Sequence, residues 1–172
     1  MKKIATFFIL IAIGCAPQQE KISESDVIKT VEGFFEALDV ENNNPDLLDN
    51  YVTQDFILYE VGRKMNKDEF VEFVSGFPLI ESDWELSDFR ISTDINSAYI
   101  SLFNTGNFLL QTDSAKIQQK KEWLESAYIV REEEKLKIKF YFSDNISVET
   151  DTINVMNTLE FNKRPLTRNK LH

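Results

Sequence analysis

The chain has very little cysteine and histidine: its 172 residues contain one of each, Cys15 and His172. A lone cysteine forms no disulfide within the chain, and one cysteine with one histidine cannot build a Cys/His zinc site. Catalysis by Ser-His-Asp or Cys-His also needs a histidine within the folded domain, whereas His172 is the last residue. Within one chain, these absences exclude Cys/His zinc sites and enzymes that use a Ser-His-Asp or Cys-His arrangement.

Glycine and proline are also scarce, at five and four residues, which argues against a disordered chain. The glycine-rich patterns GxGxxG and GxxxxGK[ST] are both absent, so we expect no nucleotide cofactor. The acidic residues are dispersed and show no EF-hand spacing, and we expect no metal, although a site made of carboxylates alone stays open. No cofactor is therefore predicted.

The chain has few basic residues relative to acidic ones, and its formal net charge is -10. Without residues 1–14, 17 basic and 29 acidic residues remain, which makes the net charge −12. Such an acidic surface repels a phosphate backbone, so nucleic acid is not expected as a partner. Fourteen Phe, five Tyr and two Trp supply enough large apolar side chains for the core of one domain.

The first fifteen residues have the layout of an export signal. Lys2 and Lys3 precede an apolar run over residues 4–13, which is too short to span a bilayer as a helix. The ending Ala12-Ile13-Gly14-Cys15 resembles the lipobox of bacterial lipoproteins, in which the cysteine is lipidated. We therefore predict a signal peptide over residues 1–14, a lipidated Cys15, and a tether over residues 15–22.

That resemblance also implies a location, the bacterial cell envelope, with the membrane as a partner through Cys15. Ala16 follows the cysteine, and by the sorting rule of enterobacterial lipoproteins this favours the outer membrane over the inner one.

Three helices are predicted before residue 80. The first begins at the N-cap Ser23 and has an apolar face that includes Val27 and Val31. The second begins at Asn44 with Pro45 in its first turn. The third begins with the capping box Asn66-Lys67-Asp68-Glu69 and ends near Gly76.

One strand is predicted between the second and third helices, and longer strands follow the third. Residues 55–61 predict an early strand with a turn at Gly62-Arg63, and from Trp84 onward apolar residues alternate with polar ones. Polar joints separate these longer segments, which is typical of an antiparallel meander.

This order of elements resembles the NTF2-like superfamily, which includes ketosteroid isomerase and the SnoaL-type cyclases. The similar motifs are Phe34-Phe35-Glu36-Ala37-Leu38-Asp39, Tyr51-Val52-Thr53-Gln54-Asp55-Phe56 and Trp123-Leu124-Glu125-Ser126-Ala127. The resemblance implies an α+β cone, in which three N-terminal helices pack on a strongly curved antiparallel sheet. The domain is expected over residues 23–146, followed by a partly disordered C-terminal extension over residues 147–172.

The resemblance to ketosteroid isomerase can be followed residue by residue. Phe34 stands where that enzyme has a catalytic tyrosine, and Glu60 stands at about the place of its general base. Its second oxyanion-hole acid has no convincing counterpart, so we do not expect steroid isomerisation. Glu60 is the best candidate for chemistry; the alternative is a solvent-exposed carboxylate or a pair with Arg63.

The wide end of the cone implies a pocket. Its predicted border is Phe34, Leu58, Glu60, Trp84, Asn104, Trp123 and Tyr141. Trp84 and Trp123 have an alternative place in the core, and Asn104, Ser126 and Tyr141 have an alternative role in satisfying the backbone. The charged runs Glu132-Glu133-Glu134 and Lys116 to Lys121 are predicted to be solvated.

Three classes of function follow. The first, which we favour, is a lipid-anchored module that binds a small apolar or amphipathic ligand in the cone. The second is a small isomerase- or cyclase-type enzyme with Glu60 as base. The third is an interaction subunit that forms a homodimer through the open face of its sheet.

We predict that the protein is recovered from the membrane with an acylated Cys15 as its first residue. The two or three acyl chains of bacterial lipoproteins anchor a protein stably, whereas one chain anchors weakly. Intact-mass analysis checks this. A soluble, unmodified chain that begins at Met1 would contradict it.

Overall fold

The computed structural model describes residues 20–42 and 44–153. The predicted signal peptide, Cys15, most of the tether and residues 154–172 lie outside this part. Within the described ranges, no helix is long and apolar enough to cross a membrane.

The helices begin and end close to the predicted residues. They are α1 (Glu24–Glu36), the 3-10 helix η1 (Pro45–Asn50) and α2 (Lys67–Ser75). The side chains of Ser23 and Asn44 accept hydrogen bonds from the backbone of their first turns, and Asn66 forms the predicted capping box with Glu69. The second predicted helix is therefore a tighter 3-10 helix, which is common for so short a segment.

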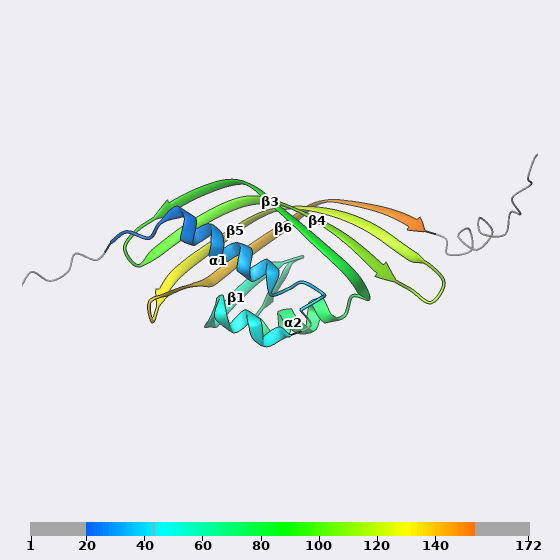
Figure 1. Ribbon diagram of the computed structural model, residues 1–172, viewed down its shortest axis with the longest axis horizontal. Helices are drawn as coiled ribbons and strands as arrows, with labels where there is room; N and C mark the ends of the chain where they lie inside the picture. The colour runs from blue at the N-terminus through cyan, green and yellow to red at the C-terminus, as the bar shows by residue number, and fades with distance from the viewer. Residues whose placement is uncertain (1–19, 43, 154–172) are drawn as a thin grey trace, which may run out of the picture.

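The strands form one six-stranded sheet of order β2-β1-β6-β5-β4-β3. Their bounds are β1 (Val52–Glu60), β2 (Arg63–Met65), β3 (Leu79–Thr93), β4 (Ser97–Gln111), β5 (Lys116–Glu132) and β6 (Lys135–Ile153). Figure 1 shows β3 to β6 as a long arch, with α1 and α2 on its concave side. The architecture is the expected α+β cone with a strongly curved sheet.

One pairing departs from the antiparallel expectation, because β1 runs parallel to β6. The strands β3 to β6 do form the predicted antiparallel meander. A short hairpin sets the direction of each strand in the meander relative to its neighbour. β1 is separated from the meander by β2 and α2, so no hairpin fixes its direction.

The sequence did not predict β2. It forms a hairpin with β1, in which Glu60 pairs with Arg63. The two loop residues, Val61 and Gly62, have φ values of 46° and 74°, as a tight hairpin turn requires. Three residues are too few to show a period of two, and so only the turn was visible in the sequence.

The sheet continues beyond the predicted domain boundary at residue 146. β6 stays paired with β5 as far as Ile153, which pairs with Lys116. Residues 148–153 are exposed on both sides of the sheet. An apolar alternation needs one buried face, so these residues lack the signal that marks the other strands and were placed in the C-terminal extension.

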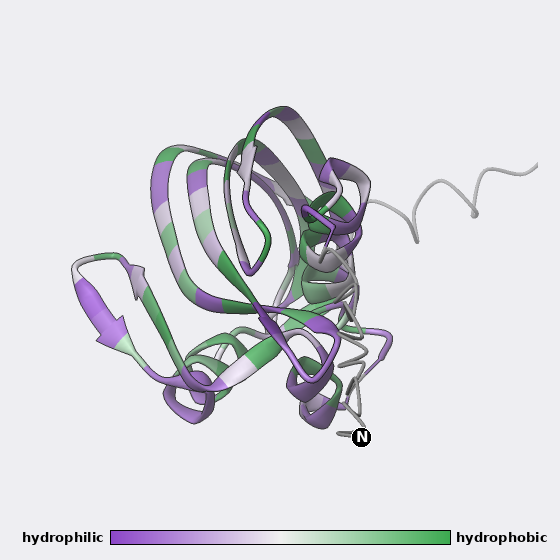
Figure 2. Ribbon diagram, turned by 90° about the vertical axis from the view of Figure 1, so that its left-hand side faces the viewer, coloured by the Kyte–Doolittle hydropathy of each residue, from purple (hydrophilic) through white to green (hydrophobic). Residues whose placement is uncertain are grey.

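The curvature comes from irregularities in the long strands. Register shifts occur between Ser87 and Arg90 in β3, and in the pairing of β5 with β6 at Glu122/Trp123 and Tyr128/Ile129. Extra residues of this kind bend a strand and increase its twist. Figure 2 shows the bent strands with alternating hydrophobic and hydrophilic stripes, so one face of the sheet packs on the helices while the other faces outward.

Candidate functional site

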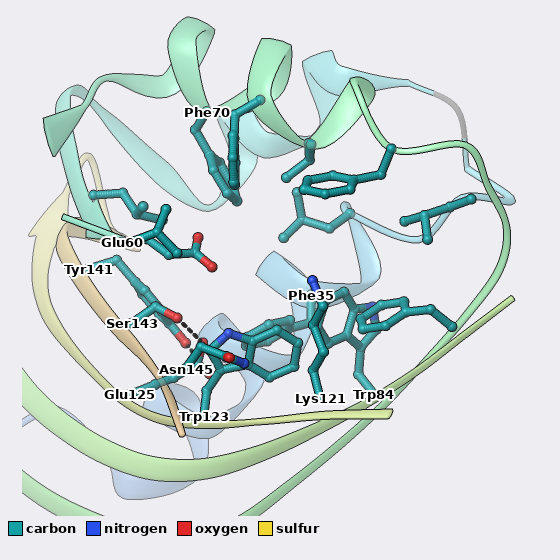
Figure 3. Close-up of a pocket in the computed structure, with 18 of the residues that line it drawn as sticks. Phe35, Glu60, Phe70, Trp84, Lys121, Trp123, Glu125, Tyr141, Ser143 and Asn145 are labelled. Atoms are coloured by element: carbon teal, nitrogen blue, oxygen red, sulfur yellow. Dashed lines mark hydrogen bonds between the residues drawn. The ribbon is translucent and has the colours of Figure 1, made fainter. Parts of the chain in front are cut away.

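A cavity of about 220 Å³ lies between the helices and the concave face of the sheet (Figure 3). Nine aromatic side chains line it, including Phe34 and Phe35 from α1, Phe70 and Phe73 from α2, and Trp84 and Trp123 from the sheet. The three groups meet because the apolar stripe of each helix faces the inward residues of the strands.

Six of the seven predicted pocket residues line this cavity: Phe34, Leu58, Glu60, Trp84, Trp123 and Tyr141. The seventh, Asn104, is fully buried and is not among the residues that line the cavity. Neither amide atom of Asn104 has a hydrogen-bond partner among the described residues. Ser126 lies on the opposite face of β5, because it alternates with the inward residues Glu125 and Ala127.

Glu60 is the last residue of β1, and its carboxylate points into the cavity in Figure 3. Burial raises the pKa of Glu60, while the nearby Lys121 and Trp123 lower it by a smaller amount. The predicted alternative pair with Arg63 is not among the ion pairs of the described residues. The Arg63 guanidinium instead lies 5.3 Å from the centroid of the Phe73 ring.

A second carboxyl group, Glu125, lies at the floor of the cavity and was not among the predicted site residues. It is only 6% exposed. The Tyr141 hydroxyl donates to Glu125 Oε2 at 2.9 Å, and the Ser143 hydroxyl donates to Oε1 at 3.1 Å. Figure 3 shows these bonds as dashed lines. Glu125 therefore has a built polar environment on the wall of an otherwise apolar cavity.

Burial raises the pKa of Glu125 to about 7, although the hydrogen bonds from Tyr141 and Ser143 and the nearby Asn104 lower it. The charge of Glu60 raises it further. Burial and Glu125 also raise the pKa of Tyr141, so the phenol stays protonated and remains a donor. Near neutral pH, Glu125 is thus divided between its neutral and ionised forms.

The sequence contained a signal for Glu125. Within β5, residues 123, 125, 127 and 129 share one face, and their side chains are buried. Glu125 is a carboxylate at a position whose neighbours in phase, Trp123 and Ala127, are apolar. A charged residue in phase with a buried face marks either a mistaken phase or a functional group, and here it is a group on the cavity wall.

Lys121 corrects another expectation, since the run Lys116 to Lys121 was predicted to be solvated throughout. Lys121 shares the inward face of β5 and lines the cavity. Its ammonium lies 5.2 Å from the centroid of the Phe77 ring. The ammonium of this long side chain is therefore one of the charged groups of the cavity.

The described residues contain no group of three or more His, Cys, Asp or Glu side chains that could hold a metal ion. The chemistry available at the site is that of two carboxyl groups, one ammonium and a phenol facing aromatic rings. Such a site can accept hydrogen bonds or protons and can enclose an apolar body.

No family model matches the sequence. No curated protein matches it either. The structure is similar to a scytalone dehydratase-like protein from Novosphingobium aromaticivorans, at a TM-score of 0.57 and 11% identity, over 85% of this chain and 94% of that chain.

Two further similarities concern proteins described in different terms. A ketosteroid isomerase-like protein from Erwinia carotovora atroseptica has a TM-score of 0.56 at 16% identity, over 72% of this chain and 95% of that one. The S. rosetta CaMKII hub has a TM-score of 0.58 at 13% identity, over 71% of this chain and 95% of that one. At such identities the likeness shows the fold alone: the chain has the NTF2-like cone fold predicted from its sequence.

The raised pKa of Glu125 predicts a pH-dependent cost to stability. The ordinary pKa is 4.5, so between about pH 5 and pH 7 the unfolded chain loses the proton that the folded protein retains. Stability attributable to Glu125 is therefore present at low pH and lost as the pH rises through 7, by about 2 to 3 kcal/mol. Urea unfolding of wild type and Glu125→Gln measures this at about pH 5 and pH 8.

Relative to wild type, Glu125→Gln will be more stable at the higher pH than at the lower one by that amount. Glu122→Gln, on the outward face of the same strand, is the control and will show no such change. An equal difference at both pH values would contradict the raised pKa.

Proposed function

We propose that the cone binds a small, largely apolar ligand. The observation that supports this most directly is the cavity of about 220 Å³, whose lining is mostly aromatic and aliphatic with a smaller number of polar side chains. An engineered apolar cavity of roughly 150 Å³ accepts benzene, so a cavity of this size accommodates a body of one or two rings. Few polar groups on a mostly apolar wall are the usual composition of a ligand site.

Membrane attachment is the second part of the proposal. A lipidated Cys15 would place the domain at the bacterial cell envelope, with the outer membrane favoured by Ala16. Both residues lie outside the described part of the chain, and the support is the lipobox-like sequence alone. In this arrangement the domain would bind its ligand close to a membrane surface.

Acid–base catalysis is a second candidate function, favoured by two cavity carboxyl groups with raised pKa values. Glu125, whose pKa is about 7, would accept and return protons near neutral pH. Catalysis additionally requires a substrate proton within reach of Glu60 or Glu125, whereas binding requires only the cavity. Binding is therefore the function that we propose first.

The outer face of the sheet supports association with a second copy. Tyr59, Tyr99, Leu124, Tyr128 and Phe142 are each at least 40% exposed and alternate with buried residues. Tyr99 lies opposite Tyr128, which in turn lies opposite Phe140, so the patch continues across three strands. An apolar patch of this kind is suited to the self-complementary contact of a twofold dimer.

Filling the cavity will weaken binding. Val74→Trp places a large side chain in the cavity from α2, so we expect the affinity for the uncharged probe 2-naphthylmethanol to fall at least about tenfold. Glu72→Trp adds the same side chain on the exposed face of α2 and serves as the control. Isothermal titration calorimetry measures both; equal binding by Val74→Trp, or no binding by wild type of this alcohol and of its amine analogue, would refute the proposal.

Charge placed on the outer patch will separate the two copies. Tyr128→Glu introduces facing carboxylates into an apolar contact, so we expect the dissociation constant of the dimer to rise at least about tenfold. Lys29→Glu adds negative charge at an exposed site on α1 and is the control. Analytical ultracentrifugation decides: a monomeric wild type at micromolar concentration would rule out the homodimer.

A further inference from the structure

We infer that the ligand of this cavity is an organic cation, an amine or ammonium group attached to an aromatic or aliphatic body. The inference rests on the proposed binding function and adds the charge of the ligand. It follows from three properties of the cavity: the balance of its charged groups, its aromatic walls, and the buried Glu125, whose hydrogen-bond partners are uncharged.

The charged side chains that line the cavity are two carboxylates and one ammonium: Glu60, Glu125 and Lys121. They come from β1 and β5. The cavity-lining residues of α1, α2 and β3 are apolar or aromatic and add no charge. When both carboxyl groups are ionised, the cavity therefore has an excess negative charge, which a monovalent cation would neutralise.

Lys121 does not neutralise the negative charge of Glu125. Its ammonium lies over the Phe77 ring, and its charge lowers the pKa of Glu60. The influences on Glu125 are the Tyr141 and Ser143 hydroxyls, Asn104 and the charge of Glu60, and none of them is cationic. A ligand cation would thus supply the partner that Glu125 lacks among the described residues.

The aromatic walls are also suited to positive charge. The face of an aromatic ring is electron-rich and attracts cations within about 6 Å of its centre. Two of the protein's own cations already use rings of this cavity, Arg63 over Phe73 and Lys121 over Phe77. Phe34 stacks on Tyr141 with ring centroids 5.2 Å apart, beside the hydroxyl that binds Glu125.

An anionic ligand fits the same cavity poorly. Its charge would face two carboxylates, and its one cationic partner among the lining residues would be the Lys121 ammonium. A neutral ligand would fill the apolar volume but would further bury the two carboxyl groups without a compensating charge, which is costly. The chain as a whole has a formal net charge of -10, so its long-range field also favours cations.

Cation binding also predicts a dependence on pH. A cation favours the ionised form of Glu125 and Glu60, so binding will release protons where these groups are partly neutral. The affinity for an amine that stays protonated will therefore rise between about pH 6 and pH 8. The groups that face Glu125 and set this range are Glu60, Tyr141, Ser143 and Asn104.

Three probes of matched shape test the inference on the purified protein: 2-naphthylmethylamine, 2-naphthylmethanol and 2-naphthoate. Isothermal titration calorimetry should show the amine binding at least about tenfold more tightly than the alcohol, with the carboxylate weakest, because a charge-assisted contact adds to the same apolar burial. Glu60→Gln and Glu125→Gln should each reduce this preference about tenfold, and Glu125→Gln should also flatten the pH dependence. Glu122→Gln, on the outward face of β5, should change neither.

The outcomes separate the two proposals. If the alcohol binds as tightly as the amine, or the carboxylate binds more tightly, the cation inference is overturned while binding in the cavity stands. If none of the three binds, both fall. The comparison of probes is made on the wild type, so it decides the matter even if a Gln variant does not fold.

Discussion

The structure depends on a mismatch of length between one helix and the sheet that encloses it. The thirteen residues of α1 span about 20 Å, whereas the fifteen to nineteen residues of β4 and β6 span about 50 Å or more before curvature. A single helix therefore covers only part of the concave face. The remaining part faces α2, and the cavity lies between the two helices and the sheet.

The buried polar side chains of the cavity lie at the boundary between the covered and uncovered parts of the sheet. Phe34 near the end of α1 stacks on Tyr141, which fixes the phenol so that its hydroxyl meets Glu125. Deeper under α1 the inward positions of the strands are apolar, as at Ile100, Ala127 and Ile129. Burial under the helix is favourable for apolar side chains. A carboxyl group is stable on the cavity wall because two hydroxyl groups donate hydrogen bonds to it.

Much of this fold could be predicted because the relevant signals are local. Caps at Ser23, Asn44 and Asn66 fix the helix starts, and an alternating pattern fixes the phase of strands with one buried face. The parallel pairing of β1 with β6 and the strand beyond residue 146 depend on non-local contacts or on two exposed faces. No pattern in a single segment encodes either feature.

The candidate site could also be predicted only where the signal is local. Aromatic residues such as Phe34 and Trp123 were found because an apolar residue in phase with a buried face is expected there. Glu125 was missed because a carboxylate in that phase contradicts the pattern, and only the hydroxyls of Tyr141 and Ser143 explain it. The residues that break a local rule are the ones whose partners lie on another strand.

Because side chains alternate along a strand, each residue that faces the cavity is next to one on the outer face of the sheet. Glu125 faces the cavity and its neighbour Leu124 faces outward; the same holds for Glu60 with Tyr59 and for Tyr141 with Phe142. Contact with a second copy at the outer face would therefore hold the same three strands that position the carboxyl groups. Because packed strands resist small displacements, such a contact would fix the spacing of Glu60 and Glu125, on which the charge of the cavity depends.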